Sequence, residues 1–545
     1  MTVRIKKTAI PVVAALLTGL AGPPAAALDI TATWTGAGDG HSYNNAANWD
    51  VAVVPVNFGT LIFDVVIPAG GFAVDFNVAG ASTVRSLTLG DNSQLKPLTG
   101  SDLTVTGAAG MSGIVNAQGG DLDATGPGTA FVGDRARVYG ASGSQVTIDA
   151  PTYSSKGLVF TDRLNSSSNT YTTNLFTATD AGTLLDLSSL QSIDAGFGPA
   201  GFNDANRHEI IASGGATLDL SGVKSVIAPI GASDWVRFTA SDGTTLNLSS
   251  LQTVTGSGSG KAHFRAVAAS EIQIGDLSLQ AGSVFNATDR SALHTGAITV
   301  QAPGTSFETD SGSTLKVGGD FKATASGAAS INLKNAADAL KVAGSFDLGT
   351  KLTMSAAQGA TLEVGKDLSY ALTDETKMSL GDNILRMNGT GGLQNLEVGG
   401  LNVDIFVQLL SNDNFRFGQL VVGADGQKTN VTLVDLFDNG NRGTGGTPEA
   451  LYLFGLGGAD GLRILGGSKL YLNPEPISDP SDRLPAYAVL GGQVIDLYGL
   501  FPEGVHEIVF DQGFLVEAVP LPSALILALS SFSVLFGAVR RRRVA

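Results

Sequence analysis

The feature that most constrains the fold is a short repeat in the middle of the chain. Three segments share the pattern Gly-x-x-Leu-Asp/Asn-Leu-Ser, namely Gly182–Ile193, Gly215–Val226 and Gly243–Val254. The aligned leucines Leu187, Leu220 and Leu248 lie 33 and 28 residues apart. A repeat of this size is one structural unit that cannot bury its apolar side chains until the next unit stacks on it.

A second variant of the repeat follows further along the chain. Its members share Leu-x-Val and a glycine or alanine turn: Leu315–Phe321, Leu340–Phe346 and Leu362–Leu368, spaced 25 and 22 residues apart, with Leu396–Leu401 as a further copy. Leu-x-Val is a short strand with alternate side chains pointing inward. Successive copies then pair in parallel, which predicts an all-β fold with residues 28–473 as a parallel β-solenoid, most often a right-handed β-helix. A propeller or a string of sandwiches competes, but the uneven spacing argues against equal blades.

Composition agrees with a large core and excludes several kinds of site. The chain has 545 residues, 43% of them hydrophobic and 15% charged, and it has no cysteine. It therefore has no disulfide framework and no thiolate metal site. The net charge is −16, and removal of the basic, acid-free terminal segments would leave a body of about −23. Such a body repels nucleic acid.

Residues 1–27 have the order of a secretory signal peptide. A basic start precedes a largely apolar run over residues 9–20, and Gly22-Pro23-Pro24 then breaks any helix. The small side chains of Ala25 and Ala27 fit a signal-peptidase cleft, so we expect cleavage after Ala27. The expected partners are the Sec machinery and signal peptidase. A short membrane anchor is the alternative, but the apolar run is too short to favour it.

The other end of the chain has three parts over residues 519–545. A proline-rich motif comes first, then an uncharged stretch over residues 524–539, then a basic cluster. The motif is Val519, Pro520, Leu521 and Pro522, and the cluster is Arg540, Arg541, Arg542 and Arg543. As a helix, the stretch of 16 residues would span about 24 Å, slightly short of the hydrocarbon core of a bilayer. Because the arginines favour a cytoplasmic C-terminus, the sequence predicts a transmembrane helix with the body outside the inner membrane.

This tail resembles the PEP-CTERM family of sorting signals. The family usually has Val-Pro-Glu-Pro before its helix, whereas Leu521 stands at the place of the Glu, as in the Val-Pro-Leu-Pro variant. The resemblance implies recognition by an exosortase-type membrane protease, removal of the tail, and release from an inner-membrane intermediate to the cell surface or beyond. A permanent tail anchor is the alternative. Residues 474–518 are interpreted as a linker and terminal strands, around 486–500 and 506–510.

The start of the body carries a second resemblance. Trp34-Thr-Gly-Ala-Gly-Asp-Gly, Asn45-Ala-Ala-Asn-Trp49 and Val54-Pro55 resemble an opening segment of secreted bacterial β-helical and autotransporter-like passenger proteins. The two tryptophans are expected to cap the first coil and cover its edge. A sugar-stacking platform is the functional alternative.

Residues with catalytic or metal-binding chemistry are scattered. The five histidines, His41, His208, His263, His294 and His506, stand singly and without metal-ligand spacing.

The best candidate cation site is a cluster of oxygen side chains in one loop, formed by Asp435, Asp438, Asn439 and Asn441. Calcium would need such ligands, but the spacing departs from known calcium loops and favours a turn cluster. Asp186, Asp219 and Asn247 align between repeats and predict a solvated stripe rather than a lyase site.

These observations predict an exported, non-enzymatic structural protein of the cell surface or extracellular matrix. We predict no catalytic residue, no resident metal and no cofactor. Exopolysaccharide is a hypothetical partner, because the sorting class is associated with matrix-producing bacteria, and nucleic acid is not expected as one. The alternatives are a secreted β-helix polysaccharide lyase or hydrolase and an autotransporter-like adhesin. The adhesin is disfavoured because the chain ends in arginines rather than in alternating strands.

Overall fold

The structure is a computed structural model that describes residues 27–159, 170–198, 205–324, 326–403, 414–443, 446–476 and 483–518. The chain divides into two compact units, Met1–Lys316 (unit 1) and Val317–Ala545 (unit 2). The described part is all-β, with large parallel sheets like those of a β-helix. The helical elements in it are four 3-10 turns, η2 (Ala46–Asn48), η3 (Lys156–Leu158), η4 (Glu375–Lys377) and η6 (Leu497–Leu500). The predicted all-β class is confirmed.

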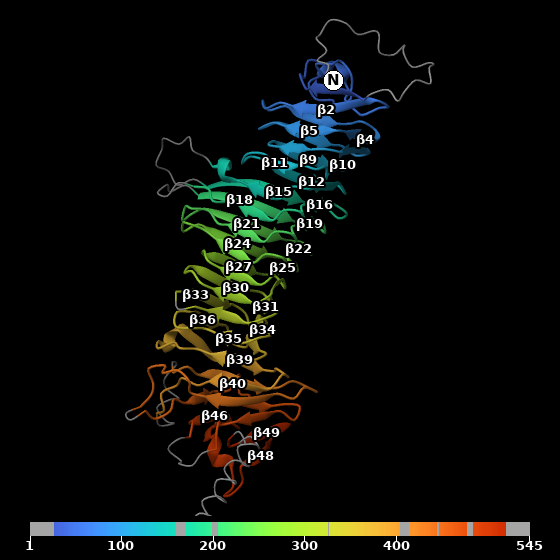
Figure 1. The fold of residues 1–545 in the computed structure, drawn as a ribbon. Coiled ribbons are helices and arrows are strands. Elements are labelled where there is room, and N and C mark those ends of the chain that lie inside the picture. Colours follow the sequence, from blue (N-terminus) through green and yellow to red (C-terminus); the bar gives the residue numbers. More distant parts are fainter. Residues whose placement is uncertain are drawn as a thin grey trace, which may run out of the picture. The chain divides into compact units, whose positions relative to one another are not determined.

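Unit 1 is built from parallel ladders in which each strand of a coil pairs with the equivalent strand of the next coil (Figure 1). Ladder 1 consists of β3 (Ala73–Phe76), β6 (Gln94–Pro97), β9 (Ile114–Gln118), β12 (Arg137–Ala141), β15 (Thr170–Ala178), β18 (Ala205–Ala212), β21 (Trp235–Ala240), β24 (Lys261–Ala266), β27 (Ser283–Ala287) and β30 (Thr305–Thr309). Ladder 2 consists of β4 (Gly80–Val84), β7 (Ser101–Val105), β10 (Asp121–Ala124), β13 (Gln145–Ile148), β16 (Leu184–Asp186), β19 (Thr217–Asp219), β22 (Thr245–Leu248), β25 (Glu271–Ile274) and β28 (Ala292–Thr295).

The third side of the coils is formed by shorter strands. Ladder 3 consists of β14 (Thr152–Ser154), β17 (Ser192–Asp194), β20 (Ser225–Ile227), β23 (Thr253–Thr255), β26 (Leu277–Leu279) and β29 (Ile298–Val300). The first coils use a separate parallel ladder of β1 (Leu28–Thr33), β2 (Leu61–Ile67), β5 (Ser86–Leu89), β8 (Ala109–Met111) and β11 (Ala130–Phe131). A further strand, β31 (Thr314–Val317), lies where the two units meet in the sequence. A coil of unit 1 therefore contributes three strands before the chain rises to the next.

The first repeat variant predicts the register of ladder 2 correctly. Leu185 lies opposite Leu218, and Leu218 lies opposite Leu246. All three side chains are fully buried, whereas their neighbours in the strands are partly or fully exposed. Alternation thus sends both leucines of each Leu-x-Leu repeat into the core and the Asp or Asn between them outward.

Stacked aromatic rings fill the core behind ladder 1. Phe238, Phe264, Phe285 and Phe307 occupy successive strands in register and are at most 1% exposed. Their ring centroids are 5.3, 4.9 and 4.7 Å apart, and neighbouring ring planes differ by 8 to 16°. Such stacks add stacking energy to the burial of large apolar surfaces. This phenylalanine ladder gives unit 1 a continuous core.

Unit 2 is also built from parallel ladders, but its strands are connected differently. One of its ladders consists of β32 (Phe321–Ala323), β35 (Phe346–Asp347), β38 (Leu368–Ser369), β40 (Leu393–Glu397), β42 (Asn430–Val434), β45 (Lys469–Tyr471) and β49 (Gly513–Val516). Two further series, β33 (Ala329–Leu333) with β36 (Thr353–Ala356), and β34 (Ala339–Val342) with β37 (Thr361–Val364), both end on the long strand β39 (Met378–Met387).

Beyond β39 the sheet is completed by β41 (Phe417–Val422), β43 (Leu451–Leu453) and β44 (Leu462–Ile464), and two antiparallel hairpins lie at the end of the described chain. One hairpin pairs β46 (Ala486–Leu490) with β47 (Gln493–Asp496), and β46 also pairs in parallel with β43. The other pairs β48 (Glu507–Phe510) with β49, and β49 also pairs in parallel with β45. The residues interpreted as terminal strands therefore extend the sheets of unit 2.

The predicted fourth copy of the second repeat variant is wrong in its position. Leu340 lies opposite Leu362, as the alignment predicts. However, Leu362 lies opposite Leu385 of β39, whereas Leu396 lies opposite Leu368 on another ladder. The Leu-x-Val-Gly pattern at Leu396 therefore marks a different side of the coil, because β39 carries the next rung with Leu-Arg-Met instead.

Candidate functional site

The predicted processing signals fall mostly outside the described residues. The ranges 1–26 and 519–545 are not described, and they contain Ala25, the motif Val519, Pro520, Leu521 and Pro522, and the arginines Arg540, Arg541, Arg542 and Arg543. Ala27 is described and exposed, and β1 begins at the next residue. Between residues 27 and 518, as far as they are described, no helix is long and apolar enough to cross a membrane.

The four oxygen-bearing residues predicted as a calcium site or turn cluster lie in one loop after β42, but their side chains serve different partners. Asp435 Oδ1 accepts a hydrogen bond from Arg442 Nη2 at 2.6 Å, and its Oδ2 accepts one from the Glu449 backbone N–H at 3.0 Å. Asp438 Oδ1 accepts one from the Gly440 N–H at 2.9 Å. The structure therefore favours the turn cluster over a shared cation.

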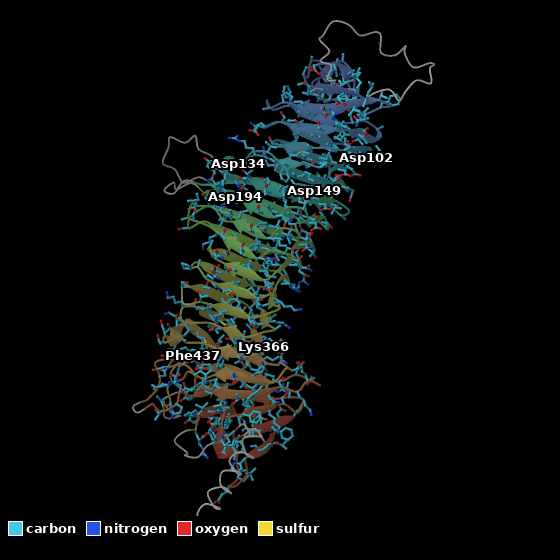
Figure 2. The ribbon with its side chains drawn as sticks, in the orientation of Figure 1. Asp102, Asp134, Asp149, Asp194, Lys366 and Phe437 are labelled. Carbon is cyan, nitrogen blue, oxygen red and sulfur yellow. The ribbon has the colours of Figure 1, made fainter. Side chains whose placement is uncertain are left out.

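Two buried glutamates that the sequence analysis missed hold this loop. Glu397, at the end of β40, and Glu449 are both fully buried. Oε1 of Glu397 accepts hydrogen bonds from the backbone N–H groups of Leu436 and Phe437 at 2.9 and 2.8 Å. The side chain of Phe437, labelled in Figure 2, is 40% exposed. The loop backbone thus covers Glu397, and the apolar side chain of Phe437 stays on the outside of the loop.

Glu449 serves the second half of the loop in the same way. Its Oε1 accepts hydrogen bonds from the backbone N–H groups of Asn439 and Asn441 at 2.9 and 3.0 Å. Asn439 is itself buried, and its Nδ2 donates to the carbonyls of Tyr370 and Leu372 at 3.2 and 2.9 Å. The loop is therefore tied to a coil almost seventy residues earlier in the sequence.

Each of these buried polar side chains keeps one oxygen without a hydrogen-bond partner among the described residues. The four atoms are Oε2 of Glu397, Oε2 of Glu449, Oδ1 of Asn439 and the hydroxyl of Tyr370. Leaving a buried polar atom unpaired is costly, and for a carboxylate the cost falls when the group takes up a proton. Burial accordingly raises the pKa of Glu397 to about 8 and that of Glu449 to about 7. The cluster therefore binds protons near neutral pH.

The histidines belong to no metal cluster among the described residues. In the parts of the chain that are described, no group of three or more His, Cys, Asp or Glu could hold a metal ion. His208 is buried and stacks on Phe197 with ring centroids 3.8 Å apart. Its burial lowers its pKa to about 4. His208 is therefore neutral at physiological pH.

The aligned acids form a stripe of turns. Asp186 lies opposite Asp219, which lies opposite Asn247. The side-chain Oδ1 of each accepts a hydrogen bond from the backbone N–H two residues later, at 3.0, 2.8 and 3.0 Å. They start the turns that leave ladder 2, as expected of Asx residues. Other acids also line the outside of unit 1, and Figure 2 labels Asp102 and Asp149 among them.

Both N-terminal tryptophans are buried. Trp34 and Trp49 are 1% and 3% exposed and meet edge to face with ring centroids 5.0 Å apart. Tyr43 packs between Trp49 and Phe76 of β3, at 4.8 and 4.7 Å. The pair therefore forms a small core at the start of unit 1, as expected for a cap, and neither ring is open for stacking on a sugar.

No family model, curated protein or solved structure matches this chain. Its function must be inferred from its residues and their geometry.

Proposed function

We propose that this chain is an exported, non-enzymatic structural protein of the cell surface or extracellular matrix. The observation that carries the proposal is the architecture: long parallel ladders with a continuous apolar core and polar residues turned outward. Within each unit such a stack gives a rigid surface, and its stability grows with the number of coils. In its finer form the fold is proposed to be a right-handed β-helix.

The terminal segments supply the route of export in this proposal. The Sec machinery carries the chain out, signal peptidase cuts after Ala27, and an exosortase-type protease acts at Val519–Pro522 while the tail spans the inner membrane. These steps rest on the sequence of the two ends, above all on the resemblance of the tail to the PEP-CTERM signals. The acidic body would remain soluble at high density outside the cell. Exopolysaccharide of the matrix is the proposed partner.

Surface exposure can be tested by protease shaving of intact cells of the native host. We expect added protease to degrade the protein on whole cells while a periplasmic marker stays intact. Recovery of the protein in the matrix fraction would equally support the proposal. Full protection in intact cells, with degradation only after lysis, would contradict the proposal.

A further inference from the structure

Three neighbouring strands of unit 1 present an unusual set of side chains on the outside of ladder 1. In β18, β21 and β24 (Figure 1), the alternate side chains of Ile210, Phe238 and Phe264 are buried in the core. The side chains between them form three outward columns across the strands: Arg207, Trp235 and Lys261; Glu209, Arg237 and His263; Ile211, Thr239 and Arg265. We call the six residues Arg207, Trp235, Arg237, Lys261, His263 and Arg265 the cationic face.

The cationic face holds more positive charge than its one acid can neutralise. Glu209 is 3% exposed; its Oε2 accepts a hydrogen bond from Arg237 Nε at 2.8 Å, and its Oε1 forms an ion pair with Arg237 Nη2 at 2.8 Å. Within the described residues, Arg207, Lys261 and Arg265 have no carboxylate within ion-pair distance. By contrast, Arg85 and Lys156 elsewhere in unit 1 are each paired with aspartates. Unpaired cations on β18 and β24, on either side of β21, stand out in a chain of net charge −16.

Trp235 holds two of the arginines in place. The Arg207 guanidinium lies 3.9 Å from the centre of the Trp235 ring, and that of Arg237 lies 5.4 Å from it. His263 packs against the same ring from the next strand, with centroids 4.8 Å apart and ring planes tilted by 33°. Cation–π contacts of this kind hold a guanidinium in place, so a ligand need not pay for ordering it.

The face also has a buried donor without an acceptor. Nε of Arg207 is buried and has no hydrogen-bond partner among the described residues.

Burial, together with the charges of Arg237, Lys261 and Arg207, lowers the pKa of His263 to about 4. His263 is therefore neutral near pH 7, and the charge of the face comes from arginine and lysine, which keep it throughout the physiological range.

The spacing of the cations suits a linear polyanion. Arg207 and Lys261 lie two strands apart, which is about 9.6 Å, and Lys261 and Arg265 lie four residues apart on β24, which is about 13 Å. These distances are comparable to the length of two or three sugar residues, so acidic sugars spaced along one chain can each meet a cation. Arginine also matches planar carboxylate and sulfate groups with paired donors. Because Arg207 and His263 already cover Trp235, its ring is not open for the base stacking that single-stranded nucleic acids use.

We propose that the cationic face binds an anionic polysaccharide, recognised through its carboxylate or sulfate groups. This inference rests on the proposed export to a polysaccharide-containing matrix, and it names the chemistry of the partner and the side of the fold that meets it. Binding is electrostatic and therefore weakens as salt is added.

The test compares binding of the purified full-length protein to polygalacturonate, dextran sulfate and neutral dextran by affinity electrophoresis. We expect retention by one or both charged polymers and none by dextran, with loss of retention in high salt. The triple variant Arg207→Gln/Lys261→Gln/Arg265→Gln should bind about ten-fold more weakly. The double variant Lys261→Gln/Arg265→Gln leaves the buried Arg207 in place and should show a smaller loss in the same direction.

The matched control removes three cations from unit 2, as Lys322→Gln/Lys351→Gln/Lys428→Gln, and should bind as the unchanged protein does. Circular dichroism confirms that each variant is folded. Equal binding by the double variant and the control, no binding of the unchanged protein to either charged polymer, or stronger binding to single-stranded DNA than to both would overturn the inference. If the protein is removed from intact cells by protease but fails these binding assays, only the binding role of the cationic face is contradicted. If it binds but stays protected inside the cell, the proposed export is contradicted instead.

Discussion

Replacing Phe264 with alanine should destabilise unit 1 by about 3–5 kcal/mol. Phe264 is fully buried, and its ring stacks between Phe238 and Phe285 at 5.3 and 4.9 Å. Removing it takes away its own buried surface, leaves a cavity in a continuous core and breaks two ring contacts. Because neighbouring coils stabilise each other, the loss should spread along the ladder rather than remain local.

Urea unfolding followed by tryptophan fluorescence measures this effect. All three tryptophans of the chain, Trp34, Trp49 and Trp235, lie in unit 1, so their emission reports on that unit. Phe58→Ala is the matched control: its side chain is 75% exposed, and we expect a change below about 0.5 kcal/mol. Similar midpoints for the two variants would contradict the proposed role of the phenylalanine ladder.

Unit 2 should lose stability as the pH rises from about 5 to about 9. In the folded protein, burial raises the pKa of Glu397 to about 8 and of Glu449 to about 7, against an ordinary value of 4.5. Between these values the folded state holds protons that the unfolded state has released, so each rise in pH favours unfolding. The contribution of the two protonated glutamates to the stability of unit 2 is fully present below their ordinary pKa. It is lost as the pH rises through their raised pKa values. The expected total is several kcal/mol, with about 8 kcal/mol as its upper limit.

Thermal melting followed by far-ultraviolet circular dichroism across this pH range tests the prediction, with tryptophan fluorescence reporting on unit 1 alone. The variant Glu397→Gln/Glu449→Gln imitates the protonated side chains and should flatten the pH dependence of the melting of unit 2. The exposed Glu503 supplies the control Glu503→Gln, which should leave it unchanged. A double variant with the same pH profile as the unchanged protein would show that other groups bind the protons.

The leucine repeats predict the fold class and the register of ladder 2, because the buried leucines of each Leu-x-Leu repeat leave a regular pattern in the sequence. They do not predict the buried loop cluster. Leu396 and Val398 are both buried, so alternation along the strand would turn Glu397 toward solvent. It is buried because the loop after β42 covers it, and this contact joins residues about forty positions apart.

The cationic face could not be predicted from the sequence, for a related reason. The recognisable repeats run along ladder 2, whereas Arg207, Trp235 and Lys261 lie on ladder 1 and share no residue type. Only the pairing of the strands brings them into one column. The length of each coil varies with its turns, so the register of one ladder does not reveal the alignment of another.

The most direct test of the proposed function is the intact mass and cell fraction of the protein in its native host, with and without alanine at Val519, Pro520, Leu521 and Pro522. We expect the unchanged protein in the surface or medium fraction with a mass that lacks both terminal segments. The alanine variant should remain in the inner membrane with its tail attached. An unchanged protein that keeps its tail and stays in the inner membrane would contradict the account and indicate a permanent anchor.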